Sequence, residues 1–289
     1  MKKAISIVVV LLLMVTSCHR SKSVSDEMRT VTTDSTEVNN IVSATDTLKT
    51  DTVSFEKQEG IYKLGLSADY PVAGGDSVVK AVREFINNFH GGAYEGTLDN
   101  GKAMINRNGE MMWGTFLERC GDADSEEVGE LFLYKMVEKG YETNSFVTFM
   151  ASTTQYTGGI HGIGYEEGHT FSKVDGKEFS YDMMKDIDSP TFKRLIKEGL
   201  KEFFSKKSDQ KNMSDEDLLT ELVAYDGSAD ELPLPDSEPY MTEKGVTFIY
   251  QPYEISYYAA GRPEFTIPYD IVKPYLKPET IELFLKNDR

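Results

Sequence analysis

The chain has 289 residues, of which 31 are basic and 48 acidic, and its formal net charge at pH 7 is −17. This acid surplus excludes a nucleic-acid-binding protein, because such a protein needs a cationic surface that displaces the counterions of phosphates. The chain has only two cysteines, Cys18 and Cys120, which excludes a scaffold held by several disulfides and a metal cluster built from cysteines.

The first 17 residues have the layout of a signal peptide. Lys2 and Lys3 precede an almost unbroken apolar run, Ile5 to Val15, which is about half as long as the ~20 residues of a membrane-spanning helix. Small residues then lead to Cys18. This arrangement resembles the lipobox of bacterial lipoproteins, in which the cysteine carries the lipid and becomes the first residue of the mature protein. The alternatives are a signal peptide cleaved elsewhere and a membrane anchor, and the polar residues after Cys18 argue against the anchor.

A lipid on Cys18 predicts attachment to a membrane without a spanning segment. His19 stands where an aspartate would resemble the retention signal of the inner membrane. We therefore expect the outer membrane if the cell has one, with the protein facing the periplasm or the cell surface. Without Lys2 and Lys3 the mature chain has 29 basic and 48 acidic residues, a net charge of −19. This charge favours a basic partner through electrostatic steering, although solubility alone is a sufficient reason for it.

Composition divides the rest of the chain. Residues 18–52 are rich in serine, threonine, aspartate and lysine and have no apolar period, so we expect a lipidated cysteine followed by a disordered tether. Residues 53–289 are long enough for one sizeable core or two small ones. We expect two α+β regions there, 53–144 and 145–289.

The first region begins with apolar residues that alternate as in a strand. Apolar residues then recur at helical spacing, with Asp76 or Ser77 positioned to cap the helix and Gly91-Gly92 to end it. The expected elements are, in order, β-structure over 55–70, a helix over 77–90, a short helix around 116–120, and strands over 131–137 and 146–156.

The second region mixes hairpins with helices. Ser214 and Asp217 have the spacing of a capping box. The expected elements are a hairpin of 163–172 and 177–181, a helix from residue 190, a helix after Ser214, a loop over 226–239, a hairpin of 240–242 and 246–250, a strand over 263–269, and short helices over 270–276 and 278–285. Strands in hairpins, with helices between groups of them, predict an α+β fold of antiparallel sheets with helices packed on one face.

Three motifs follow one another in the second region. The first, YTGGIHG at 156–162, has three glycines within five residues, which implies a tight turn with positive φ. The second, DGKEFSYD at 175–182, is a turn and a strand. The third comprises QPYEI at 251–255, YYAAG at 257–261 and FTIPY at 265–269.

In order and spacing these motifs resemble the extracytoplasmic domain of unknown function in RsiV-type anti-sigma factors. The same module resembles the non-catalytic N-terminal region of PdaC-type peptidoglycan deacetylases. The likeness is strongest over 145–277 and weaker over 53–144, and the sequence shows neither the spanning helix of the first group nor the deacetylase domain of the second. The resemblance implies a ligand-binding module, and since RsiV-type proteins bind lysozyme, it implies lysozyme binding as a hypothesis.

The two loops that carry the first and third motifs contain the candidate ligand-binding residues. Tyrosines beside proline and glycine in a loop are typical of a recognition surface for protein or sugar. The alternatives are that these tyrosines pack in the core, and that His161 orders the glycine turn through a backbone hydrogen bond. The candidates are Tyr156, Gly158, Gly159, His161, Pro252, Tyr253, Tyr257, Tyr258 and Gly261.

The sequence contains no nucleophile elbow and no histidine near Cys120, so we expect no catalytic residue, cofactor or metal. We expect Cys120 to be a buried thiol, with a bridge between two chains as the second option. The alternative function is a metal-dependent hydrolase of cell-wall material, with zinc bound by His161, Glu167 and His169. We favour an interpretation in which His169 is a surface residue of a strand.

Together these observations predict a non-catalytic lipoprotein of the cell envelope that binds a ligand. The predicted ligand is a basic cell-wall-lytic protein such as lysozyme, or peptidoglycan itself.

Overall fold

The computed structural model describes residues 47–121, 129–208 and 212–286, all within one unit of the chain, residues 41–289. The predicted signal peptide, Cys18 and the tether as far as residue 46 lie outside the described residues. Among the helices within those three ranges, none is long and apolar enough to cross a membrane.

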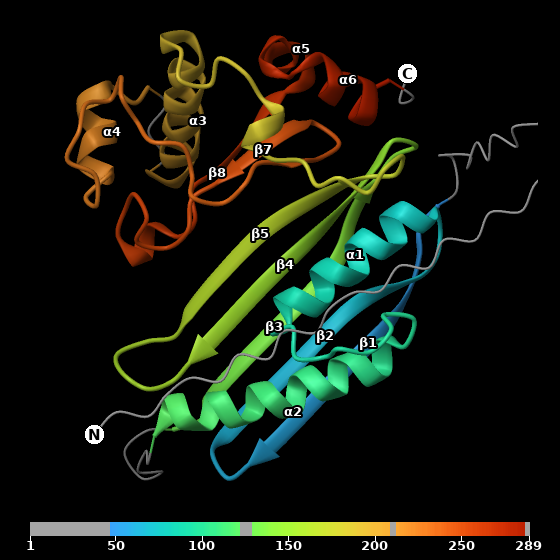
Figure 1. Ribbon diagram of the computed structural model, residues 1–289. Coiled ribbons are helices and arrows are strands. Elements are labelled where there is room, and N and C mark those ends of the chain that lie inside the picture. Colours follow the sequence, from blue (N-terminus) through green and yellow to red (C-terminus); the bar gives the residue numbers. More distant parts are fainter. Residues whose placement is uncertain (1–46, 122–128, 209–211, 287–289) are drawn as a thin grey trace, which may run out of the picture. The chain divides into compact units, whose positions relative to one another are not determined.

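Five strands form the first sheet, in the order β1-β2-β3-β4-β5 (Figure 1). Their bounds are Lys49–Glu59 for β1, Tyr62–Ala73 for β2, Leu131–Glu142 for β3, Phe146–Tyr156 for β4 and Ile163–Ser172 for β5. Neighbouring strands are antiparallel except β2 and β3, which are parallel. A parallel pair requires a long crossover connection, and residues 74–130 supply it.

The first strand starts earlier than predicted. Residues 49–52 belong to β1, where they pair with the end of β2, and the Leu48 side chain before them is buried. The predicted end of the tether at residue 52 is therefore wrong, because pairing with β2 recruits polar residues that have no strand pattern of their own.

Two helices in the crossover, α1 (Asp76–Phe89) and α2 (Gly101–Cys120), pack on one face of this sheet (Figure 1). The prediction of α1 is confirmed, but its cap is not. The N-cap residue is Gly75, with no side-chain hydrogen bond. Asp76 instead lies in the first turn, where the helix dipole stabilises its negative charge.

Helix α2 is much longer than the short helix predicted around residue 116. Its N-cap residue is Asn100, whose side chain accepts a hydrogen bond from the N–H of Ala103 at 2.9 Å. Glycines interrupt its apolar pattern, and one of them is required by packing. The Phe55 ring lies so close to Gly109 that a Cβ there would be 2.2 Å from it.

The C-terminal part of the chain contains a three-stranded antiparallel sheet, β6-β7-β8, and four α-helices among the described residues. The bounds are Pro190–Ser208 for α3, Asp215–Glu221 for α4, Tyr240–Met241 for β6, Gly245–Ile249 for β7, Glu264–Pro268 for β8, Tyr269–Val272 for α5 and Pro278–Phe284 for α6. The predicted capping box is confirmed, with Ser214 and Asp217 bonding reciprocally. The predicted strand at 177–181 is reduced to one bridge, between Phe171 and Glu178.

The predicted α+β fold is confirmed, but the predicted division at residues 144 and 145 is wrong. It falls in the turn between β3 and β4, which pair along their length in one sheet. The apolar residues form two cores, one between the five-stranded sheet and α1 and α2, and one in the C-terminal part. Since the sheet ends at Ser172, the change from one core to the other falls after that residue. Phe146 on β4 nevertheless joins the C-terminal core.

A small ring of hydrogen bonds connects β4 and β5 to β6. The Met241 N–H donates to Thr170 Oγ1 at 2.8 Å, and Thr148 Oγ1 donates to the Met241 carbonyl at 2.8 Å. The two hydroxyl oxygens are 2.7 Å apart. Because the Thr148 proton is used on Met241, Thr170 donates to Thr148. All three residues are buried, and the ring satisfies both backbone groups of Met241.

Replacing Thr170 by valine tests this connection. Thr170→Val keeps the shape of the side chain but leaves the buried Met241 N–H without its acceptor. We expect the free energy of unfolding to fall by about 1–3 kcal/mol, measured by urea denaturation at pH 7. The control is Thr52→Val, an exposed residue of β1. Equal losses for the two variants would contradict the role of the ring.

Candidate functional site

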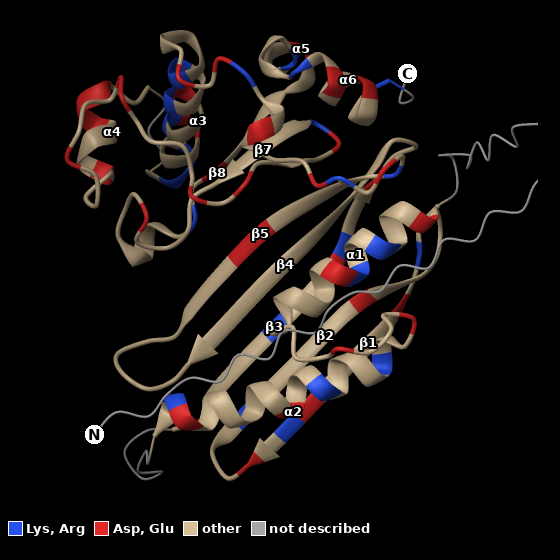
Figure 2. Ribbon diagram, in the orientation of Figure 1, with Lys and Arg blue, Asp and Glu red and all other residues tan. Residues whose placement is uncertain are grey.

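The β4–β5 loop, residues 157–162, is uncharged and glycine-rich (Figure 2). Gly158 and Gly159 have φ of 104° and 101°, a conformation that favours glycine, so the predicted positive-φ turn is confirmed. The Tyr156 hydroxyl donates to the Gly159 carbonyl at 2.9 Å and closes the turn. Ile160 between the glycines and His161 is fully exposed.

His161 meets two tyrosines of the loop between β7 and β8. Its ring lies 4.1 Å from that of Tyr258, with 18° between the planes, and Tyr253 stacks beside both, 5.7 Å from Tyr258. Nδ1 lies 2.8 Å from the Gly162 carbonyl, which only accepts, so Nδ1 carries a proton. In the neutral ring Nε2 then accepts from the Tyr253 hydroxyl at 3.1 Å. We call His161, Tyr253 and Tyr258 the aromatic platform.

The Gln251 side chain holds the second loop against β5. Its Oε1 accepts from the Glu166 N–H at 3.2 Å and its Nε2 donates to the Glu166 carbonyl at 2.7 Å, as a neighbouring strand would. Two residues later, Tyr253 has a φ of 69°, which costs on the order of 1–3 kcal/mol in a non-glycine residue and is typical of functional sites. The Tyr253 side chain is 52% exposed.

A pocket of about 680 Å³ adjoins the platform, and we call it the platform pocket. Its lining comprises Thr154, Gly162, Ile163, Gly164, Phe203, Pro252, Tyr258, Ala260, Gly261, Arg262 and Glu264. Its volume lies in the range of small-ligand sites, about 300–1,000 Å³. Tyr258 belongs to both the platform and the pocket wall, so one ligand can contact both.

The charged groups of the platform pocket are already paired. Arg262 Nη2 lies 2.6 Å from Glu166 Oε2, and the Tyr240 hydroxyl donates to Glu264 Oε1 at 2.7 Å. Burial and the Glu264 carboxylate hold the pKa of Tyr240 well above its usual range, so this hydroxyl stays protonated. The pocket therefore offers hydrogen-bonding groups in fixed positions: one ion pair, and a Glu264 carboxylate whose hydrogen-bonding partner, Tyr240, is neutral.

The structure separates the predicted site residues into three groups. His161, Tyr253 and Tyr258 form the platform, while Pro252 and Gly261 line the pocket with Tyr258. Tyr156, Gly158 and Gly159 shape the β4–β5 turn. Tyr257 points elsewhere, with its hydroxyl 3.1 Å from Glu221 on α4. The hydrogen bond to Gly162 also confirms that His161 orders the glycine turn.

No sequence motif marks Arg262, Glu166 or Glu264 as site residues. Acidic residues number 48 in this chain, so no single one stands out by type. The only signal for Arg262 is its place directly after Gly261. The pairing of Arg262 with Glu166 joins positions 96 apart in the sequence, which no local pattern encodes.

The three residues of the zinc alternative do not converge. The described ranges contain no group of three or more His, Cys, Asp or Glu side chains that is arranged to bind a metal. His169 is not the surface residue that we expected, because its side chain is only 17% exposed. Its Nδ1 lies 2.6 Å from Glu178, and its Nε2 lies 3.7 Å from Glu167, an ion-pair distance too long for a hydrogen bond.

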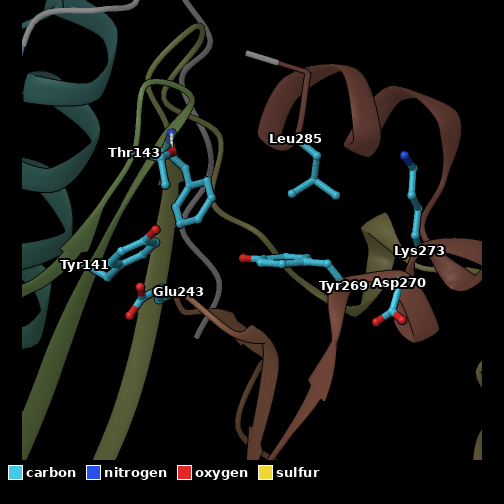
Figure 3. Close-up of a pocket in the computed structure, with 8 residues that line it drawn as sticks. Tyr141, Thr143, Glu243, Tyr269, Asp270, Lys273 and Leu285 are labelled. Carbon is cyan, nitrogen blue, oxygen red and sulfur yellow. Dashed lines mark hydrogen bonds between the residues drawn. The ribbon is translucent and has the colours of Figure 1, made fainter. Parts of the chain in front are cut away.

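A second pocket, of about 480 Å³, lies near the other end of β4 (Figure 3). Tyr141, Thr143 and Phe146 line it from β3, β4 and their turn, and the remaining lining residues are Glu243, Tyr269, Asp270, Lys273 and Leu285. None of the predicted site residues borders this pocket, so it is separate from the platform.

Residues 182–270 match the family described as "Protein of unknown function (DUF3298)", and no curated protein matches the chain. The fold is similar to that of a DUF3298 family member from Bacteroides fragilis NCTC 9343, with a TM-score of 0.65 and 17% identity over 82% of this chain and 96% of that one. A DUF3298 family protein from Pseudomonas aeruginosa PAO1 has a TM-score of 0.56 and 16% identity over 83% and 98%. These findings support the part of the prediction that places a domain of unknown function in this chain.

The carboxylates around His169 predict a distinctive pH dependence. Burial alone lowers the pKa of a histidine, as at His90, where it falls to about 4. Burial also acts on His169, but Glu167 and Glu178 outweigh it and raise the pKa to about 9. The imidazolium should therefore stabilise the fold fully below about pH 6.5, its unfolded pKa, and this contribution should disappear as the pH rises through about 9.

His169→Gln should be less stable than the natural protein at pH 6 by on the order of 3 kcal/mol, and this difference should shrink at pH 10. Urea denaturation at both pH values measures it, and NMR titration of the imidazole locates the pKa. The control is His161→Gln in the exposed loop. A His169 signal that titrates near pH 6.5 would refute the stabilisation of the imidazolium by Glu167 and Glu178.

Proposed function

We propose that this chain is a non-catalytic binding module of the bacterial cell envelope, and that it binds the glycan of peptidoglycan at the aromatic platform and the platform pocket. The observation that carries the proposal is the platform itself. Three aromatic rings stack on an exposed surface, held by the strained Tyr253 backbone and the hydrogen bond from its hydroxyl to His161.

A sugar has the chemistry that this surface suits. Each pyranose ring has a face of C–H groups, which packs on an aromatic ring, and a rim of hydroxyls, which need hydrogen-bonding partners. The platform supplies rings, and the pocket supplies paired polar side chains, Arg262 with Glu166 and Glu264 with Tyr240. Since each of these charged groups already has a hydrogen-bonding partner, the pocket suits an uncharged polyhydroxyl ligand better than a free anion.

The envelope location in this proposal rests on the sequence around Cys18, with its basic start, apolar run and lipobox-like end. A lipid there would place the module next to the cell wall. We also propose that the module is of the RsiV or PdaC type, on the motifs at 156–162, 175–182 and 251–269.

Tyr253→Ala should weaken binding to purified peptidoglycan about five- to tenfold, because it removes one ring of the platform. Co-sedimentation with insoluble peptidoglycan measures the bound fraction. His161→Ala should have a similar effect, and Tyr253→Phe a smaller one, because it loses only the hydrogen bond to His161. Ile271→Ala, an exposed apolar residue of α5, is the control. Unchanged binding by Tyr253→Ala and His161→Ala would sink the proposed site.

The charge of the chain favours a second candidate, a basic cell-wall-lytic protein such as lysozyme. The mature sequence has a net charge of −19, and Ile160, fully exposed on the β4–β5 loop, offers an apolar anchor. Complementary charge raises the rate of association and makes binding depend on salt.

Titration with lysozyme tests this candidate. Binding should weaken as the salt concentration rises from about 0.01 to 0.15 M, because the Debye length falls from about 30 to 8 Å. Ile160→Ser should weaken binding at both salt concentrations, while the control Val72→Ser, also exposed, should not. The absence of binding at low salt would eliminate lysozyme as the partner.

A further inference from the structure

The face of the five-stranded sheet opposite α1 and α2 is covered only in part, by the C-terminal part of the chain at Phe146, Thr148 and Thr170. Helices α1 and α2 cover the face that Leu64, Leu66 and Leu133 share. Side chains alternate between faces along a strand, so Phe132 and Tyr134 on β3 point to the opposite side, which we call the open face. Their rings are 5.4 Å apart with 29° between the planes, and Tyr134 is 42% exposed.

The strand register brings this ring pair to the platform pocket. Tyr134 is paired with Thr154 on β4, and Thr154 is paired with Gly164 on β5. Directly paired residues share a face, and neighbouring strands lie about 4.8 Å apart. Since Thr154 and Gly164 line the platform pocket, Tyr134 lies one strand beyond its wall, on the same face.

The paired residues Gly164, Thr154, Tyr134 and Gly65 form a row across the strands, and the small residues in it leave space on the open face. Tyr134 is paired on its other side with Gly65 of β2, where a Cβ would be 2.7 Å from Cδ1 of the Tyr134 ring. The ring therefore leans over the Gly65 backbone, in space that any larger residue would fill. From Gly164 through Thr154 and Tyr134 to Gly65, the row contains no charged side chain.

Phe132 continues the aromatic surface towards the β4–β5 loop. It is paired with Tyr156, and the two ring centroids are 6.3 Å apart. Tyr156 in turn bonds to Gly159 in the turn that presents His161. Rings therefore follow one another from the open face to Tyr156, at the base of the turn that presents His161.

From this arrangement we infer that the platform pocket is one end of a longer site, and that Tyr134 and Phe132 form a second stacking position for the same ligand. The occupant is a linear, uncharged glycan strand that crosses β5, β4 and β3. This inference rests on the proposed function and deepens it, because it specifies a polymer chain in place of a single sugar or a chain end. The uncharged row and the repeated rings suit a repeating polymer.

Chain length tests the inference directly. The probes are β-1,4-linked oligomers of N-acetylglucosamine with two, four and six units, titrated calorimetrically against the purified protein. A dimer fills one position, whereas a hexamer reaches both, so affinity should rise at least about tenfold from dimer to hexamer, which corresponds to about 1.4 kcal/mol for the added contact. Tyr134→Ala should remove this gain and leave dimer binding unchanged.

Matched variants separate the two positions. Tyr253→Ala should weaken every length, since all oligomers use the platform, and Tyr134→Phe should retain the length dependence. Val72→Ala, an exposed residue near the end of β2, is the control. Thermal unfolding of each variant checks that the surface substitutions leave the fold intact.

Each other outcome overturns the inference. Equal affinity for the dimer and the hexamer, or equal loss of both in Tyr134→Ala, refutes the second position while the proposed function stands. The absence of binding at every length refutes the proposed sugar ligand and the inference together. Self-association that Tyr134→Ala abolishes, seen by sedimentation, would assign the open face to a second copy of the chain instead.

Discussion

The site depends on how β4 and β5 are joined to the C-terminal part of the chain. The hydroxyls of Thr148 and Thr170 form hydrogen bonds with the carbonyl and the N–H of Met241, as a neighbouring strand would. A buried backbone group without a partner costs about 1–3 kcal/mol, so this ring of hydrogen bonds favours one relative position of β6 and the sheet. Gln251 repeats the device further along β5, at Glu166. Together they bring the loop with Tyr253 and Tyr258 to the loop with His161.

Buried charge is handled by pairing throughout this region. His169 keeps its proton because Glu167 and Glu178 face it, whereas His90, buried with no carboxylate partner and near Lys135, does not. Arg262 and Glu166 neutralise each other beside the platform pocket. The carboxylate of Glu264, which also lines this pocket, is hydrogen-bonded to the neutral Tyr240 hydroxyl and has no ion-pair partner among the described residues. The acid surplus of the sequence therefore does not indicate which charges at the site are paired.

The family match and the platform do not coincide. Residues 182–270 include Tyr253 and Tyr258, but His161 and the open-face residues precede them. The similar solved structures each match more than four fifths of this chain, far more than the residues matched by the family model. The binding surface that we propose thus requires both cores, and a fragment of residues 182–270 alone would lack the His161 ring and the stacked pair on β3.

Local patterns were sufficient wherever a property depends on neighbouring residues. The amphipathic period of α1, the capping box of α4 and the glycines of the β4–β5 turn could be predicted from the sequence, because spacing and φ preference act within a few residues. The α+β class followed from the order of these elements. The length of helix α2 was underestimated because Gly109, a poor helix former, is required there by the close approach of the Phe55 ring. The division of the chain was misplaced because strand pairing joins β3 to β4. Which candidate tyrosines form the platform, the pairing of Arg262 with Glu166 across 96 positions, and the row that joins Tyr134 to the pocket were decided only by the tertiary structure. They depend on contacts between distant residues, and a register shift of one residue would turn every side chain of a strand to the other face.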